Sequence, residues 1–96
     1  MTNQQILFFE ELSYIQEYCV NVALCNSKRY ESDEERLRDI THEAIYRVME
    51  LIDGYACDLP KFMLINTETG EALNEEIELH DKCVECLSNP LHRNEE

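Results

Sequence analysis

The residues of this chain best suited to chemistry lie near its C-terminus, where His80, Cys83 and Cys86 stand three apart and His92 follows. Zinc is bound in proteins by four such thiolate or imidazole groups arranged as a tetrahedron. Residues three apart on a helix are rotated by about 60° from one another, so the first three side chains converge poorly on one ion, and His92 or Cys57 would have to complete the set. A zinc site is therefore an alternative interpretation, and two packed cysteines beside a surface histidine are the simpler one.

Two other patterns that often mark enzymes are incomplete. His42-Glu43 begins the HExxH pattern of zinc proteases, but Tyr46 stands where the second histidine belongs. The chain has only two glycines, too few for a glycine-rich phosphate loop, and it has no GxSxG nucleophile pattern. We therefore predict a protein that is not an enzyme and that needs no cofactor, zinc being required only under the alternative interpretation.

Negative charge is the strongest signal in the composition. The chain carries 21 acidic against 8 basic residues, a formal net charge of −13. Such a chain repels nucleic acid and anionic lipid surfaces. No apolar run approaches the roughly 18 residues of a membrane span. We expect neither nucleic acid nor a membrane as a partner.

Six of the acidic residues lie between positions 68 and 81, a stretch without Lys or Arg. They are Glu68, Glu71, Glu75, Glu76, Glu78 and Asp81. A surface of this kind can dock a basic protein with fast, salt-sensitive association. Our leading hypothesis is a protein-binding module of the inhibitor or immunity type, whose size and charge suit the partner of a toxin or nuclease. The simpler interpretation is a solvated face that maintains solubility.

Five cysteines, an odd number, are scattered along the chain at positions 19, 25, 57, 83 and 86. The N-terminus lacks the basic region, apolar core and cleavage site of a secretory signal. Thiols in this number and context are typical of a reducing compartment. We expect a cytoplasmic protein with free cysteines.

Two long helices are predicted to form the framework of the molecule. Thr2 with Gln5, and Ser32 with Glu35, have the spacing of capping pairs at the starts of helices over residues 3–25 and 33–54. The apolar seam of the first helix comprises Phe8, Leu12, Ile15, Cys19 and Val22. The apolar face of the second comprises Leu37, Ile40, Ala44, Val48, Leu51 and Tyr55. Because the connection is only about seven residues long, we expect the two helices to pack antiparallel.

The first helix has more apolar surface than one seam requires. A second stripe, about 100° from the seam, is formed by Leu7, Tyr14, Tyr18 and Cys25. A third side carries Ile6, Val20 and Leu24. Either the C-terminal half of the chain covers the second stripe, or the stripe is the face of a homodimer in which paired helices form a four-helix bundle. A homodimeric helical scaffold is thus a further alternative for the role of the protein.

The pattern changes after the second helix. An apolar run, turn residues ending in Gly70 and a short return predict a β-hairpin over residues 61–73. Asn74 is a candidate N-cap for a third helix over residues 75–88, which Pro90 terminates before a tail of residues 89–96. We therefore predict one small domain, residues 1–96. It is mainly α with a minor β element: two long antiparallel helices, a short hairpin and a third helix.

Overall fold

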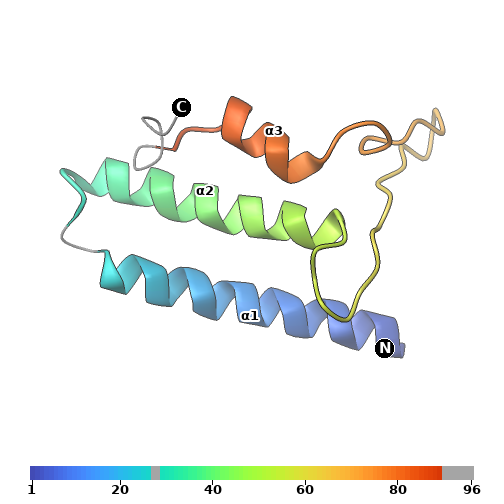
Figure 1. Cartoon of the computed structure of the whole chain (residues 1–96), viewed down its shortest axis with the longest axis horizontal. Coiled ribbons are helices and arrows are strands. Elements are labelled where there is room, and N and C mark those ends of the chain that lie inside the picture. Colours follow the sequence, from blue (N-terminus) through green and yellow to red (C-terminus); the bar gives the residue numbers. More distant parts are fainter. Residues whose placement is uncertain (27–28, 90–96) are drawn as a thin grey trace.

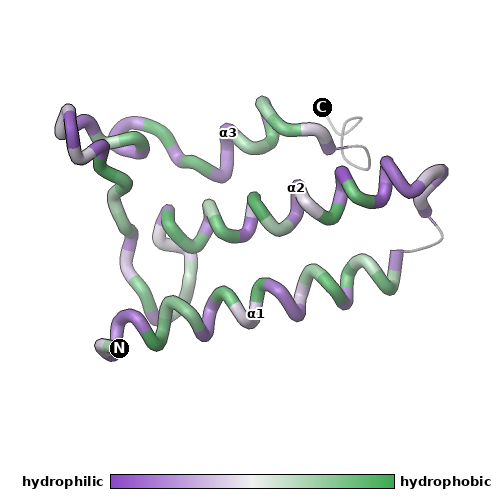
Figure 2. The backbone as a smooth tube through the Cα atoms, turned by 180° about the vertical axis from the view of Figure 1, so that it is seen from behind, coloured by the Kyte–Doolittle hydropathy of each residue, from purple (hydrophilic) through white to green (hydrophobic). Residues whose placement is uncertain are grey.

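Three helices form one layer in the computed structural model, which describes residues 1–26 and 29–89 (Figure 1). They are α1 (Asn3–Cys25), α2 (Asp33–Ile52) and α3 (Leu79–Cys86). Helix α2 lies in the middle, with α1 antiparallel along one side and α3 antiparallel along the other, as the views from both sides show (Figures 1 and 2). The prediction of a mainly helical chain is confirmed.

The starts of the two long helices follow the predicted capping pairs. Thr2 Oγ1 accepts a hydrogen bond from the Gln5 backbone N–H at 3.1 Å, and Gln5 Oε1 accepts one from the Thr2 backbone N–H at 2.7 Å. At the second start, Ser32 Oγ accepts from the Glu35 N–H at 3.1 Å. Thr2 with Gln5 thus satisfies two backbone donors and Ser32 satisfies one, and these donors have no partner within the helix, which explains why the helices begin where they do.

The end of α2 is a tight turn that returns the chain to the helix. Gly54 adopts φ +96°, a left-handed conformation that glycine accepts readily. A Cβ atom at this position would lie 2.9 Å from the backbone N and Cα of Lys61. Just beyond, the Phe62 N–H donates to the Ile52 carbonyl at 2.8 Å. The turn therefore requires glycine both for its dihedral angle and for the close approach of the returning chain.

The prediction of a β-hairpin over residues 61–73 is wrong, because no strand forms anywhere in the described ranges. What forms is a turn with one isolated antiparallel bridge between Ile65 and Ala72. The Asn74 side chain accepts from the Leu64 N–H at 3.0 Å and donates to the Phe62 carbonyl at 2.8 Å. A side chain thus takes the backbone groups that a longer ladder would have used.

The predicted start of the third helix is also wrong. Helix α3 begins at Leu79 rather than at residue 75, and it ends at Cys86 rather than at residue 88. Asn74, the predicted N-cap, is completely buried, and its amide is already engaged with residues 62 and 64. Because that amide is unavailable as a cap, residues 75–78 stay outside the helix.

Most buried side chains belong to α2, to α3 and to the connector between these helices, residues 53–78. The buried hydrophobic residues are Cys19, Leu51, Ile52, Leu59, Leu79 and Cys83. Helix α1 contributes only Cys19 to this set, although it is 23 residues long. Of the predicted seam, the other members are only half-buried. The ring of Phe62 packs edge-on against Phe8, with centroids 5.7 Å apart, so the connector covers the beginning of α1.

Within the described part of the chain, no helix has the length and apolar character needed to cross a membrane.

The two glycines provide a matched test of the turn after α2. Replacing Gly54 with Ala should lower the free energy of unfolding by about 2 kcal/mol or more, because it adds a clash with the Lys61 backbone to the strain of a positive φ. Replacing Gly70 with Ala should cost only about 1 kcal/mol, because its φ is +77° but no atom lies within 4 Å of the added Cβ. Urea denaturation of both variants measures the difference. Equal losses would show that the contact with Lys61 is unimportant.

Candidate functional site

A buried pair, Asp53 and His80, joins the end of α2 to the start of α3. Asp53 Oδ2 accepts a hydrogen bond from the His80 backbone N–H at 2.9 Å and lies 2.6 Å from His80 Nδ1. The two side chains are 0% and 8% exposed. The N-cap residue of α3 itself, Glu78, makes no side-chain capping bond. Asp53 therefore caps α3 from the neighbouring helix.

The surroundings of the pair favour its charged form. Burial by itself would raise the pKa of the Asp53 carboxyl, but hydrogen bonds from the backbone and ring of His80 and from the backbone of Leu79 hold that pKa below its usual value. Burial by itself would lower the pKa of the His80 imidazole, but the hydrogen bond to Asp53 and the charges of Asp81, Asp53 and Glu78 hold it above its usual value.

Aromatic rings enclose the histidine on two sides. The ring of Tyr55 lies 4.7 Å from the His80 ring and that of Tyr46 lies 5.5 Å from it, both in edge-on geometry. The pKa of the Tyr55 hydroxyl is raised to about 12. The largest cause is its hydrogen bond to Glu78, and the second is desolvation. These contacts fix the plane of the imidazole, so that Nδ1 stays directed at the carboxylate.

Asp53 was not predicted as a site residue from the sequence. The signal that could have found it is a carboxylate at the C-terminal end of a helix, where the helix dipole disfavours negative charge. A residue placed against its local preference needs a partner elsewhere. Here that partner is the N-terminal end of α3, 27 residues further along the chain.

The structure brings His80 to acids rather than to the cysteines of the predicted zinc set. Potential ligand atoms of Asp53, Glu78 and His80 lie within 4.8 Å of one another. Cys83 is buried and Cys86 is exposed, and neither belongs to this group. The fourth predicted ligand, His92, lies outside the described residues. The zinc alternative has no direct test here and stays a prediction.

The geometry of the group is that of a hydrogen-bonded pair. Ligands about 2.0–2.1 Å from a tetrahedral zinc ion are about 3.3 Å apart. The 2.6 Å contact between Asp53 Oδ2 and His80 Nδ1 is shorter than this and is the length of a charge-assisted hydrogen bond. As they are placed, these two atoms bind each other and not a common ion.

Four of the six acids predicted to bind a partner line one groove on the α3 side of the molecule. They are Glu75, Glu76, Glu78 and Asp81. The groove has a volume of about 450 Å³, and Lys61, Ile77, Lys82 and Glu85 complete its lining. Glu85 was not predicted, although it follows Asp81 by one helical turn. Glu68 and Glu71 are exposed in the turn that precedes the groove and do not line it.

The predicted dimer stripe on α1 is exposed for the most part. Tyr14 is 74% exposed and Cys25 is exposed, whereas Leu7 is half-buried. The fourth member, Tyr18, is tied to α2: its hydroxyl accepts from Arg47 Nη2 at 2.9 Å, and the guanidinium lies 4.6 Å from the ring centroid. The stripe is therefore partly engaged within the chain, and its role in a dimer stays a prediction.

The five cysteines are free thiols, as expected.

Comparisons of the chain with protein-family models, with curated proteins and with solved structures found no match.

The pH dependence of stability should reveal the Asp53–His80 pair. Because the folded pKa of His80 is raised, the stabilisation from its charged ring is complete below pH 6.5 and is lost as the pH rises through the folded value. Because the folded pKa of Asp53 is lowered, its contribution is present above pH 3.8 and is lost as the pH falls through the folded value. Urea denaturation should give the highest free energy of unfolding between these limits.

Two variants identify the groups responsible. Replacing His80 with Gln retains an N–H donor but removes the titrating ring, so the decline in stability above pH 6.5 should flatten. Replacing Asp53 with Asn should lower the free energy of unfolding by about 2 kcal/mol at pH 6. The variant loses the negative charge that caps α3 and that pairs with the imidazole of His80. If both variants keep the wild-type pH profile, other groups control the dependence.

Proposed function

We propose that this protein is a non-enzymatic interaction protein whose acidic groove binds a basic segment of a protein partner. The observation that supports this proposal best is that Glu75, Glu76, Glu78 and Asp81 surround one groove together with Glu85. Carboxylates that converge from a loop and a helix can bind several lysine or arginine side chains at once, and arginine can do so with two hydrogen bonds to each carboxylate.

The groove also offers an apolar contact and a partly neutralised edge. Ile77 lines it and is 39% exposed. On the same side, Lys82 Nζ lies 3.0 Å from Glu85 Oε2, and this exposed pair moderates the negative charge locally. A matching segment would therefore carry basic residues around an apolar one. The net charge of −13 would speed the encounter at low salt.

The framework under the groove is fixed by buried polar contacts. Asn74 hydrogen-bonds residues 62 and 64 and so holds the loop that leads into the groove. Asp53 hydrogen-bonds His80 in the first turn of α3. The backbone that carries the acids is therefore held in place before a partner binds. Preorganisation of this kind reduces the entropic cost of binding.

A second candidate function, metal binding, is favoured by the grouping of Asp53, Glu78 and His80. A zinc ion would have to open the hydrogen bond between Asp53 and His80 before it could use both residues. Elemental analysis of protein purified without chelator separates the two candidates. Stoichiometric zinc would support the second candidate alone.

Charge reversal tests the acidic groove. Glu75 and Glu76 are exposed, so the double variant Glu75→Lys/Glu76→Lys should retain the fold. A basic partner captured from a lysate of the source organism should bind this variant at least about tenfold more weakly than the wild type at 150 mM salt. Calorimetric titration with the purified partner measures the dissociation constant.

The matched control changes the same charge on another face. The variant Glu10→Lys/Glu17→Lys alters two exposed acids of α1 that lie outside the groove. Both variants lose the same long-range attraction, so the difference between them isolates the groove. Equal weakening would reduce the acidity to a general steering effect, and the absence of any basic partner at low salt would refute the proposal.

A further inference from the structure

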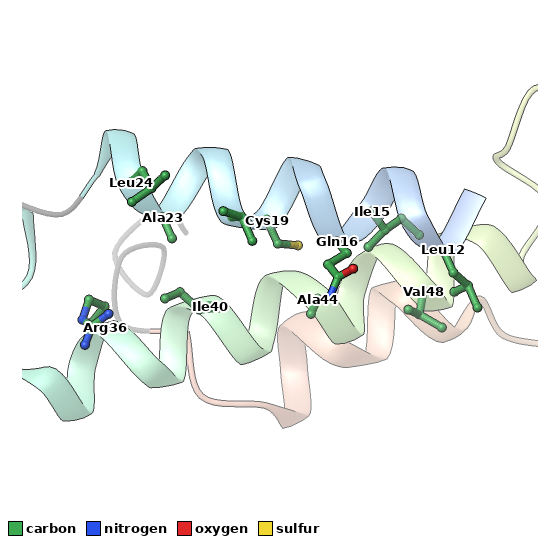
Figure 3. Close-up of a pocket in the computed structure, with 11 residues that line it drawn as sticks. Leu12, Ile15, Gln16, Cys19, Ala23, Leu24, Arg36, Ile40, Ala44 and Val48 are labelled. Carbon is green, nitrogen blue, oxygen red and sulfur yellow. The ribbon is translucent and has the colours of Figure 1, made fainter. Parts of the chain in front are cut away.

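The side of the α1–α2 pair shown in Figure 3 is an apolar groove of about 500 Å³, and among the described residues only those of α1 and α2 line it. Leu12, Ile15 and Cys19 of α1 line it from one side. Ile40, Ala44 and Val48 of α2 line it from the other. The stability of helices in proteins comes mainly from burial of an apolar face, yet α1 buries only Cys19.

The apolar surface is exposed on both helices and extends beyond the groove. On α1, Val20 and Leu24, which line the groove, are 48% and 69% exposed. Phe9 lies outside the groove, is 55% exposed and by helical spacing shares their face. On α2, Leu37 is 54% exposed, and by helical spacing it lies on the same face as Ile40 and Val48. A contiguous surface of this size, left in water, is typical of an interaction site.

The charge of this face identifies the class of occupant. None of the residues that line the groove is acidic, and its polar members are Gln16 and Arg36. A chain with a net charge of −13 can associate with itself only through a surface that keeps carboxylates apart. This face meets that requirement, whereas the predicted stripe lies beside Glu10, Glu17 and Asp58.

The dimensions of the face suit a dimer. Helix α2 has 20 residues and is therefore about 30 Å long. Two helices with axes about 9 Å apart present a face of over roughly 500 Å² in projection, and the accessible area of interdigitating side chains is larger. A stable interface needs about 800 Å² of accessible surface on each partner.

We propose that a second copy of the chain covers this face, so that two α1–α2 pairs form a four-helix bundle. A pair of antiparallel helices presents the same patch on both copies, which is the requirement for a closed two-fold interface. This interface differs from the predicted one. Tyr18 and Val20 flank Cys19 about 100° to either side of the helix, so the predicted stripe and the proposed face diverge from the Cys19 seam.

Molar mass in solution tests the interface. Sedimentation equilibrium of the full chain from 1 to 200 µM should give twice the 11.4 kDa chain mass at the upper concentrations. Replacing Leu24 or Val20 with Glu should return the mass to that of the single chain, because the dimer would bury a carboxylate without a partner in an apolar interface. Both positions are exposed in the single chain, so each variant should keep its helical circular dichroism.

Tyr14→Glu is the matched control. It adds the same charge to α1 at a position that is 74% exposed and belongs to the predicted stripe, and the double mass should persist. Three results would overturn the proposal. The first is a single-chain mass for the wild type at 200 µM, which would leave the groove to another protein or an apolar ligand. The second is a mass that neither Leu24→Glu nor Val20→Glu lowers, and the third is a mass that Tyr14→Glu alone lowers.

Discussion

The hydrogen bonds between Asp53 and the first turn of α3 are the interaction on which the rest of the structure depends. The carboxylate sits at the C-terminal end of α2, where the helix dipole disfavours it, and at the N-terminal end of α3, where the dipole favours it. The charged ring of His80 further favours the ionised form of the Asp53 carboxyl. Without α3, Asp53 would be a charge at the wrong end of its helix. Without Asp53, α3 would lack a capping side chain. The two helices therefore stabilise each other's ends.

The long connector between these helices is ordered by side chains rather than by a sheet. Gly54 lets the chain turn back against the end of α2, and Asn74 holds residues 62 and 64 with one amide. The amide is completely buried, and an unpaired polar group in such a place would be costly. Other arrangements of the loop would break its two hydrogen bonds and are therefore strongly disfavoured. The consequence for function is that Glu75 and Glu76 follow a fixed point and stand close to the acids of α3.

The success of sequence-based prediction here depends on how far each interaction reaches along the chain. The starts of α1 and α2 could be predicted, because Thr2 with Gln5 and Ser32 with Glu35 are only three residues apart. The hairpin and the start of α3 were mispredicted, because Asn74 bonds groups 10 and 12 residues earlier. Four acids of the groove were predicted, since they are close in sequence. Asp53 was missed, since its partner is 27 residues away.

The uneven burial of the three helices links the two proposals. On its α3 side, α2 is covered and is joined to α3 by the hydrogen bonds between Asp53 and His80. On its other side, α1 buries only Cys19 and contributes little to the core. The acidic groove and the apolar groove share no lining residue, so a second copy on the apolar face would leave the acidic groove open. The proposed dimer would then carry two acidic grooves related by two-fold symmetry. A partner with two basic segments could engage both at once, and its affinity would rise through effective concentration without any new contact.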